Sequence, residues 1–157
     1  MNRTQTSTRC APTAARPLIV TAAVLERRGR ILLAQRAQGD RLGGKWEFPG
    51  GKRERGETDR ACLRRELWEE FSLRARIGVF VGAFRHAYRH QLVELRVYRA
   101  RPGRRRLRVL AHEAIRWVRV VELGAFDLAD ADRPVAEALA QACRPRPRRT
   151  TRKRQRP

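Results

Sequence analysis

The segment with the strongest structural signal runs from Gly50 to Leu73 and reads GGKRERGETDRACLRRELWEEFSL. Its second half carries apolar residues at the spacing i, i+4 and i+8, which marks one face of an α-helix: Leu63, Leu67 and Phe71. Thr58 is a favourable N-cap, and an acidic Asp59 in the first turn suits the positive end of the helix dipole. The sequence therefore predicts a helix over 59–71 that packs one apolar face on a core.

Three glutamates of this helix fall on a second face, about a quarter-turn from the apolar one: Glu66, Glu69 and Glu70. Clustered carboxylates repel one another, so the arrangement is unfavourable without a cation. Mg²⁺ suits such oxygen ligands and completes its shell with water and phosphate oxygens. Gly50 and Gly51 allow the backbone before the helix to adopt conformations closed to other residues. The alternative is an exposed helix whose glutamates pair with Arg64 and Arg65, and spacing alone leaves both interpretations open.

The rest of the chain alternates strand-like and turn-like segments around this helix. Six apolar or alternating runs predict strands: 18–25, 31–37, 76–84, 91–100, 107–110 and 115–120. A turn near Gly29 joins the first two as a hairpin, and the short KWEF segment interrupts an irregular glycine-rich loop over 38–51. A final helix over 133–142 has Asp132 as its N-cap and Pro134 in its first turn. This order of elements is typical of one mixed α+β domain.

The chain is strongly basic, and the excess charge is concentrated at both ends. Of 157 residues, 37 are Lys or Arg and 16 are Asp or Glu, which gives a formal net charge of +21. Residues 144–157 hold eight Lys or Arg and no acid. Such ends predict a disordered basic leader over 1–17 and a disordered Arg-rich tail over 143–157, around one domain over 18–142. Basic tails can contact nucleic acid without reading its sequence, although an arginine-rich chain also leaves tails that are only solvated.

The number and spacing of the cysteines and the hydropathy of the chain indicate the cellular compartment that we expect for the protein. The three cysteines, Cys10, Cys62 and Cys143, are odd in number and far apart. That pattern argues for free thiols in a reducing compartment and against a disulfide framework or a zinc site. No apolar run approaches the roughly 20 residues needed to cross a bilayer. We therefore expect a soluble, cytoplasmic protein with no membrane partner, and the oligomeric state stays open.

The stretch after Gly51 also fits a long, spaced motif. Gly51 is followed after five residues by Glu57, and after seven more by the run RELWEE, which starts at Arg65. This resembles the Nudix box, G-x5-E-x7-R-E-U-x-E-E-x-G-U, and Leu73 supplies the closing apolar residue. The one departure is Ser72, where the family has glycine. Three further segments extend the resemblance to the MutT-like subgroup over about residues 18–142: ILLAQRA, KWEFPGGK and ADADRPVAEAL.

The resemblance implies a Nudix fold, an α/β/α sandwich with a central mixed sheet, and a hydrolase that needs Mg²⁺, with Mn²⁺ as a possible substitute. It implies that the metal ligands are Glu66, Glu69, Glu70 and the backbone carbonyl of Gly51. Glu57 and Arg65 would form a structural pair that fixes the loop to the helix. The general base stays open among Glu69, Glu70 and Glu113, which lies in a later loop and has a plain surface role as its alternative.

The resemblance also assigns substrate contacts. Lys52 and Arg36 are the expected phosphate contacts, and Phe48 and Arg36 match positions that touch the nucleoside. Asp132 matches the position where bacterial MutT uses asparagine to bind the oxidised guanine. Asparagine offers a donor and an acceptor together, whereas an ionised aspartate only accepts, and an unsatisfied base edge is strongly rejected. The expected substrate is 8-oxo-dGTP, in nucleotide-pool sanitation that avoids mutation and supports DNA repair, while Asp132 leaves CTP or a modified dCTP open.

A different class of function is a nucleic-acid-associated Nudix domain that binds but barely cleaves. The basic ends motivate this hypothesis, and Ser72 permits it. The intact Glu66, Glu69 and Glu70 argue against it, because decayed Nudix domains commonly lose these ligands. At Ser72 we expect a local stability cost instead, since a left-handed helix cap without glycine costs on the order of 1 kcal/mol.

Overall fold

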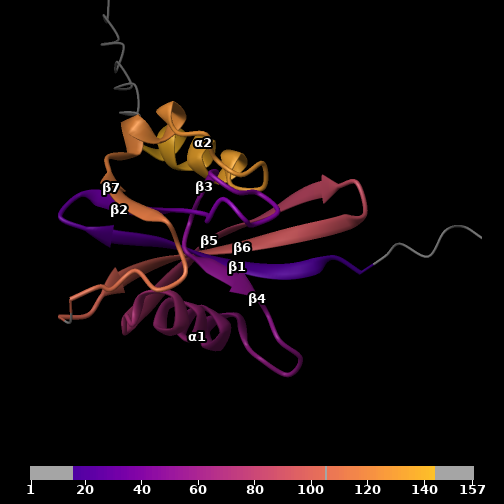
Figure 1. The fold of residues 1–157 in the computed structure, drawn as a ribbon, viewed down its shortest axis with the longest axis horizontal. Coiled ribbons are helices and arrows are strands. Elements are labelled where there is room, and N and C mark those ends of the chain that lie inside the picture. The colour runs from indigo at the N-terminus through magenta and orange to yellow at the C-terminus, as the bar shows by residue number, and fades with distance from the viewer. Residues whose placement is uncertain (1–15, 105, 144–157) are drawn as a thin grey trace, which may run out of the picture.

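The structure is a computed structural model that describes residues 16–104 and 106–143. Its elements follow one another in this order (Figure 1): β1 (Leu18–Arg27), β2 (Arg30–Gln35), β3 (Trp46–Glu47), β4 (Gly50–Lys52), α1 (Asp59–Phe71), β5 (Ala75–Tyr88), β6 (Gln91–Pro102), β7 (Ala114–Val118), the 3-10 helix η1 (Val120–Ala125) and α2 (Arg133–Ala142). The α+β class and both predicted helices are confirmed. The predicted leader and tail lie outside the described residues, apart from Arg16, Pro17 and Cys143.

The centre of the mixed sheet is β1, because three other strands pair with it. One edge of β1 pairs in parallel with β6, from Leu18 opposite Val93 to Leu25 opposite Ala100. The other edge is divided along its length: β4 pairs with it at residues 20–22, and β2 pairs with it at residues 26–27. Beyond these, β5 extends the sheet past β6, and both β3 and β7 pair with β2. This division brings the glycine strand β4 onto the middle of the sheet.

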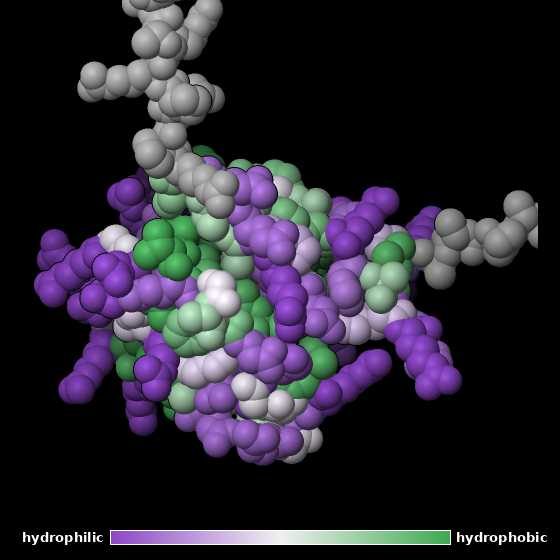
Figure 2. Space-filling view, turned by 90° about the horizontal axis from the view of Figure 1, so that it is seen from above, coloured by the Kyte–Doolittle hydropathy of each residue, from purple (hydrophilic) through white to green (hydrophobic). Residues whose placement is uncertain are grey.

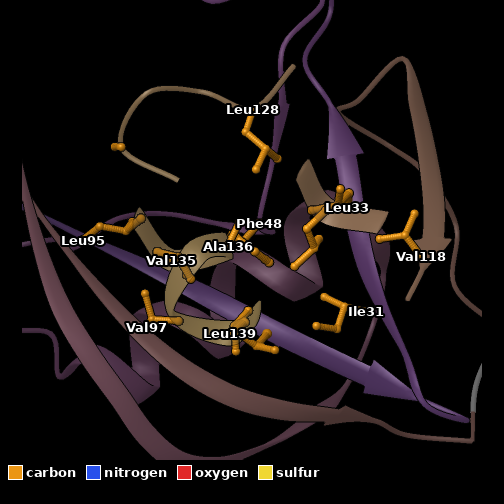
Figure 3. Packing of buried hydrophobic residues seen from close by; sticks show 14 residues of the cluster. Ile31, Leu33, Phe48, Leu95, Val97, Val118, Leu128, Val135, Ala136 and Leu139 are labelled. Atoms are coloured by element: carbon orange, nitrogen blue, oxygen red, sulfur yellow. The ribbon is translucent and has the colours of Figure 1, made fainter. Parts of the chain in front are cut away.

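Helices cover both faces of the sheet, with α1 on one side and η1 and α2 on the other (Figure 1). Side chains alternate along a strand, so β1 contributes to two separate cores. Ala23 and Leu25 pack with the predicted apolar face of α1, which is fully buried. Val24 packs in the second core, which contains Val135 and Leu139 of α2 (Figure 3). Burying each large aliphatic side chain stabilises the fold by about 1.5–3 kcal/mol, which fixes α1 firmly against β1.

The two ends of α1 follow from its flanking residues. The Thr58 hydroxyl accepts a hydrogen bond from the Ala61 backbone N–H at 3.2 Å, as an N-cap does. At the other end Ser72 adopts the left-handed conformation, with φ +50°. The N–H of Leu73 then donates to the carbonyl of Leu67, which is the bond that closes a Schellman-type cap. Ser72 therefore takes the conformation that usually requires glycine, and the end of the helix is not reshaped.

The structure corrects three expectations about the elements. The segment 107–110 is not a strand, because the backbone N–H groups of Arg108 and Leu110 donate to the last carbonyls of α1, those of Phe71 and Glu70. The glycine loop contains the unexpected strand β4, and β7 is followed by the unexpected helix η1. The hairpin turn near Gly29 is present, with Arg28 and Gly29 both at positive φ.

Two other expectations concern thiols and membranes. Cys62 and Cys143 are free, and Cys10 lies outside the described residues. Among the described residues, no helix is long and apolar enough to cross a membrane.

Candidate active site

The glycine pair lets β4 fit between β1 and the acidic face of α1. Gly50 has φ +148°, and a Cβ added to it would lie 2.1 Å from the carbonyl oxygen of Thr21 on β1. A Cβ added to Gly51 would lie 2.3 Å from the carboxyl carbon of Glu66. Real Cβ atoms do not approach other atoms so closely, so Gly50, which faces backbone, requires glycine, whereas a side chain at position 51 would displace the Glu66 carboxylate. The pair therefore brings bare backbone against a carboxylate.

Arg65 organises the outer half of this acidic face. Its guanidinium donates to both carboxylate oxygens of Glu57, at 3.1 and 3.0 Å, and to the backbone carbonyl of Lys52 at 3.2 Å. It also donates to Glu66 at 2.9 Å and to Glu69 at 3.1 Å. The hydrogen bonds from Arg65 lower the pKa of Glu57. The loop before α1 is thereby tied to the helix, in the arrangement that the sequence predicted for Glu57 and Arg65.

Glu70 lies on the inner half of the face and has a different environment. Its Oε2 is buried and has no hydrogen-bond partner. Burial raises the pKa of Glu70 to about 9, and the negative charges of Glu47 and Glu66 add to this increase, while the Gly50 backbone N–H opposes it. A carboxyl with such a pKa holds a proton at neutral pH unless a cation comes close.

A wall beside Glu70 contains two residues that the sequence analysis missed, Glu47 and His112. Glu47 accepts hydrogen bonds from Arg36 at 2.9 and 3.1 Å, and the His112 Nε2 lies 3.0 Å from its Oε1. The His112 ring stacks on Phe71, with centroids 5.2 Å apart. Glu47 could have been found from the sequence, because a charged residue between two aromatic residues, Trp46 and Phe48, is unusual in a short strand and indicates a functional role. Nothing in the sequence marks His112.

The polar atoms of this region are incompletely satisfied. In the part of the chain that the structure describes, three buried side-chain atoms have no hydrogen-bond partner, and all three lie here: Arg36 Nε, Glu70 Oε2 and His112 Nδ1. Leaving a buried polar atom unpaired costs roughly 1–3 kcal/mol. Such a concentration is typical of a site that a ligand completes.

The remaining predicted residues lie around this centre at varying depth. Glu113 is exposed, and its backbone N–H donates to the carbonyl of Gln35 at 2.9 Å, next to Arg36. Lys52 and Glu69 are exposed as well. The Gly51 carbonyl accepts from the Thr21 hydroxyl at 3.4 Å. Arg36 is engaged with Glu47 and, at 3.1 Å, with Asp40.

Asp132 and Phe48 form a second buried group on the α2 side of the sheet. Asp132 is 6% exposed, and its Oδ1 accepts from the Phe48 backbone N–H at 3.0 Å. Asp132 is the N-cap residue of α2, as the sequence predicted, but its side chain makes no capping hydrogen bond to the helix. The Phe48 ring is 3% exposed and belongs to the core (Figure 3), so in this structure only its backbone takes part in the site. Burial raises the pKa of Asp132 to about 8, against the effect of the Phe48 N–H.

The oxygen groups fit a hard divalent cation. Within the described residues, no three acidic, imidazole or thiol side chains surround one point, because Arg65 holds Glu66 and Glu69 while Glu70 turns toward Gly50. Burial raises the pKa of Glu66 against the opposing effect of Arg65, and burial and then the neighbouring carboxylates raise the pKa of Glu70. A cation such as Mg²⁺ would offset that repulsion and satisfy the unpaired Glu70 oxygen.

The chain is similar to known proteins along most of its length. The NUDIX domain family matches residues 20–138. The chain is 39% identical over 129 residues to the CTP pyrophosphohydrolase of Escherichia coli (strain K12), which covers 80% of this chain and 95% of the relative. It is also 39% identical over 126 residues to the putative 8-oxo-dGTP diphosphatase 2 of Mycobacterium tuberculosis, which covers 78% of this chain and 88% of the relative.

Solved structures agree with these matches. The solution structure of the E. coli ORF135 protein superposes with a TM-score of 0.71 at 35% identity, over 83% of this chain and 94% of that one. The MutT NUDIX hydrolase from Burkholderia pseudomallei superposes with a TM-score of 0.70 at 28% identity, over 78% of this chain and 98% of that one.

Proposed function

The chain belongs to the Nudix hydrolase family, and from that premise we propose that it cleaves nucleoside triphosphates into a nucleoside monophosphate and pyrophosphate, with Mg²⁺ or Mn²⁺ bound. The observation that carries the proposal is the buried Glu70 carboxyl beside Glu66, with the bare backbone of Gly51 against that acidic face. A polyphosphate brings the oxygens that complete the shell of a hard cation.

The acidic face supplies the groups that would hold the metal: Glu66, Glu69, Glu70 and the Gly51 carbonyl. A bound Mg²⁺ would polarise the phosphoryl oxygens and lower the pKa of the attacking water. Arg65, anchored on Glu57, orients Glu66 and Glu69 by direct hydrogen bonds.

Other residues would bind the triphosphate and move a proton. Arg36 is held by Glu47 and has an unpaired Nε, which suits a phosphate oxygen. Lys52 is exposed beside the glycines and offers a second cationic contact. The general base is one of Glu69, Glu70 and Glu113.

The preferred substrate that we propose is 8-oxo-dGTP, in nucleotide-pool sanitation, and Asp132 is compatible with it. An ionised aspartate would only accept hydrogen bonds, but a carboxyl with a pKa of about 8 keeps its proton at neutral pH. The neutral carboxyl offers a donor and an acceptor together, as asparagine does. It can therefore satisfy the paired acceptor and donor of a guanine edge.

CTP or a modified dCTP is the second candidate substrate. The amino group and ring nitrogen of cytosine also present a donor and an acceptor side by side. The relative that this chain matches over 95% of its length is a CTP pyrophosphohydrolase. The position of Asp132 alone does not separate the two bases.

A substrate panel tests the proposal. Pyrophosphate release is measured with Mg²⁺ for 8-oxo-dGTP, dGTP, CTP, 5-methyl-dCTP and UTP, for the natural chain and for Glu69→Gln. We expect the highest kcat/KM for 8-oxo-dGTP and a strongly impaired variant. No release from any nucleotide, or a variant as active as the natural chain, would contradict the proposed reaction. A higher kcat/KM for CTP would move the assignment to the second candidate.

The basic C-terminal end motivates a separate test of accessory nucleic-acid contact. Oligonucleotide binding is titrated with salt for the full chain and for a chain that ends at residue 143. If shortening the chain removes binding and leaves hydrolysis unchanged, the tail is an accessory to the enzyme. If the full chain binds oligonucleotides tightly but hydrolyses no nucleotide, the binding-domain hypothesis replaces the enzyme.

A further inference from the structure

An open hollow of about 850 Å³ lies apart from the candidate active site. It is lined by the turn between β1 and β2 and by the chain at and after the end of β6. Figure 1 shows these two segments at the same end of the molecule, on the left. The parallel pairing of β1 with β6 explains this placement, because it carries both strands toward the same edge.

Arginines make up five of the nine residues that line the hollow. All five are exposed: Arg27, Arg28, Arg101, Arg104 and Arg106. The one carboxylate in the lining is that of Glu26, and Arg99 forms an ion pair with it. Within the residues that the structure describes, none of the five has an Asp or Glu oxygen within ion-pair distance. Like charges gathered in a hollow raise the local positive potential, which attracts anions.

Both faces of the sheet contribute to the hollow, because Arg27 continues the series of Ala23 and Leu25 on the α1 side. Val24 of β1 and Val97 of β6 pack in the core that α2 covers. Because every second side chain of a strand lies on the same face, Glu26, Arg99 and Arg101 lie on that face too, beyond the end that α2 covers. Figure 2, seen from the α2 side, shows hydrophilic side chains projecting from this end on the left.

The separation from the acidic face is also large along the strand. Ala22 of β1 pairs with Gly50, and Arg27 follows five residues later. At about 3.3 Å per residue, this places the hollow roughly 16 Å from the glycine strand. A ligand in the hollow would therefore leave Glu66 and Glu70 free.

We propose that this arginine hollow is a second binding site, which takes a chain of phosphate groups such as a nucleic-acid backbone or inorganic polyphosphate. Guanidinium groups bind phosphate oxygens through paired N–H donors, and five of them exceed what one phosphate can engage. None of the lining residues is aromatic, so the site has no platform on which bases can stack. Binding is therefore independent of base sequence and depends strongly on salt.

The test compares two triple variants with the same change of charge in the full-length protein. The hollow variant is Arg27→Gln, Arg101→Gln, Arg104→Gln, and the control variant is Arg64→Gln, Arg89→Gln, Arg116→Gln, which alters exposed arginines elsewhere. Both keep the basic ends. Binding of fluorescein-labelled oligothymidylate is followed by anisotropy over a salt series, with inorganic tripolyphosphate as competitor.

We expect the hollow variant to bind about tenfold more weakly than the natural chain at moderate salt. Its slope of log affinity against log salt should fall by about 2, since each phosphate contact to a single strand contributes about 0.7. The control variant should change affinity less than threefold, and both variants should keep the natural melting temperature and nucleotide hydrolysis.

Equal losses in the two variants would overturn the proposal, because net charge alone would then explain binding. An unchanged hollow variant would overturn it as well. Displacement of the oligonucleotide by tripolyphosphate in the natural chain, but not in the hollow variant, would support the shared phosphate chemistry. Direct binding of tripolyphosphate that the hollow variant loses, without any oligonucleotide binding, would assign the site to inorganic polyphosphate.

Discussion

Two carboxyls whose charge is disfavoured, those of Glu70 and Asp132, differ in the cause. Burial raises the pKa of both, to about 9 and about 8. Glu70 is also surrounded by the negative charges of Glu47 and Glu66, and one of its oxygens has no partner. Asp132 is paired by the Phe48 N–H and lies on the other side of the sheet.

The difference separates a carboxyl that a cation would stabilise from a carboxyl that is stable as a neutral acid. A cation near Glu70 would remove both the repulsion and the unpaired oxygen, so its proton should leave when metal binds. Asp132 needs no cation, and under the proposed function its proton would serve as a hydrogen-bond donor to the base. Two carboxyls with similar pKa values therefore have different roles because their neighbours differ.

The largest effect that we expect follows from Glu70→Gln. The amide keeps the shape of the side chain but cannot bind a metal as a carboxylate, so kcat should fall about 10³-fold, in the range of losses seen when a catalytic group is removed. Steady-state pyrophosphate release with saturating Mg²⁺ measures this. If the variant keeps activity within tenfold of the natural chain, Glu70 does not hold the metal, and the proposed difference in role between Glu70 and Asp132 is contradicted.

The same substitution should stabilise the metal-free fold, and increasingly so as the pH rises. The folded-state pKa of Glu70 is raised above the ordinary glutamate value of 4.5. The part of the folding stability that depends on the protonation of Glu70 is therefore fully present below about pH 4.5 and is lost as the pH rises toward 9. Urea unfolding without metal should show Glu70→Gln more stable by a few kcal/mol at pH 8 and nearly equal to the natural chain at pH 5. A stability gain of Glu70→Gln that does not depend on pH would contradict the raised pKa of Glu70.

A smaller effect should come from Asp132→Asn and should depend on pH. Asparagine can accept from the Phe48 N–H and offers a donor that does not titrate. The natural chain should lose this donor as the pH rises through about 8. From pH 7 to pH 9, kcat/KM for 8-oxo-dGTP should therefore fall about tenfold more in the natural chain than in the variant. Comparing the two chains cancels the contribution of Glu70, and parallel profiles would show that the Asp132 proton is not used.

His112 offers a test of the wall beside Glu70. Phenylalanine can keep the stacking on Phe71 but removes the nitrogen that contacts Glu47. Glu47 and the Arg36 that it holds should become less well positioned, so His112→Phe should lower kcat/KM about tenfold, mainly through KM. His112→Gln keeps a nitrogen near the Nε2 position without the ring, and it should lose less activity. The opposite order would assign His112 to packing alone.

The smallest effect concerns the end of α1. Ser72 has positive φ in a cap that favours glycine. Ser72→Gly should raise the free energy of unfolding by about 1 kcal/mol at most, because glycine adopts this conformation without a steric cost. Hydrolysis should stay within twofold, since the cap lies beyond the three glutamates. A large gain in turnover would mean that serine impairs the site.

The helices and most strands could be predicted from the sequence because their signals are local. Both helices begin and end where apolar spacing, Thr58 and Pro134 place them. The segment 107–110 was predicted as a strand for its alternating apolar residues, yet its N–H groups cap α1, which is a contact between distant parts of the chain. Periodicity does not report where such hydrogen bonds go.

The residues of the candidate site also fall into those that the sequence predicts and those that only the fold brings together. The residues of the spaced motif, from Gly51 to Glu70, could be located from sequence because they lie in one loop and one helix. Glu47 and His112 are 65 positions apart, and only the fold brings them together. The neutral state of Asp132 also depends on burial, which no spacing in the sequence predicts.

The hydrogen bonds from Arg108 and Leu110 to the carbonyls of Phe71 and Glu70 have a consequence for motion. They attach the segment that leads to His112 to the last turn of the helix that carries the acidic face. Segments that share hydrogen bonds open together in cooperative units. The amide protons of Arg108, Leu110 and Ser72 should therefore show one common free energy of opening in hydrogen exchange, and each opening that frees the loop also loosens the helix end at Glu70.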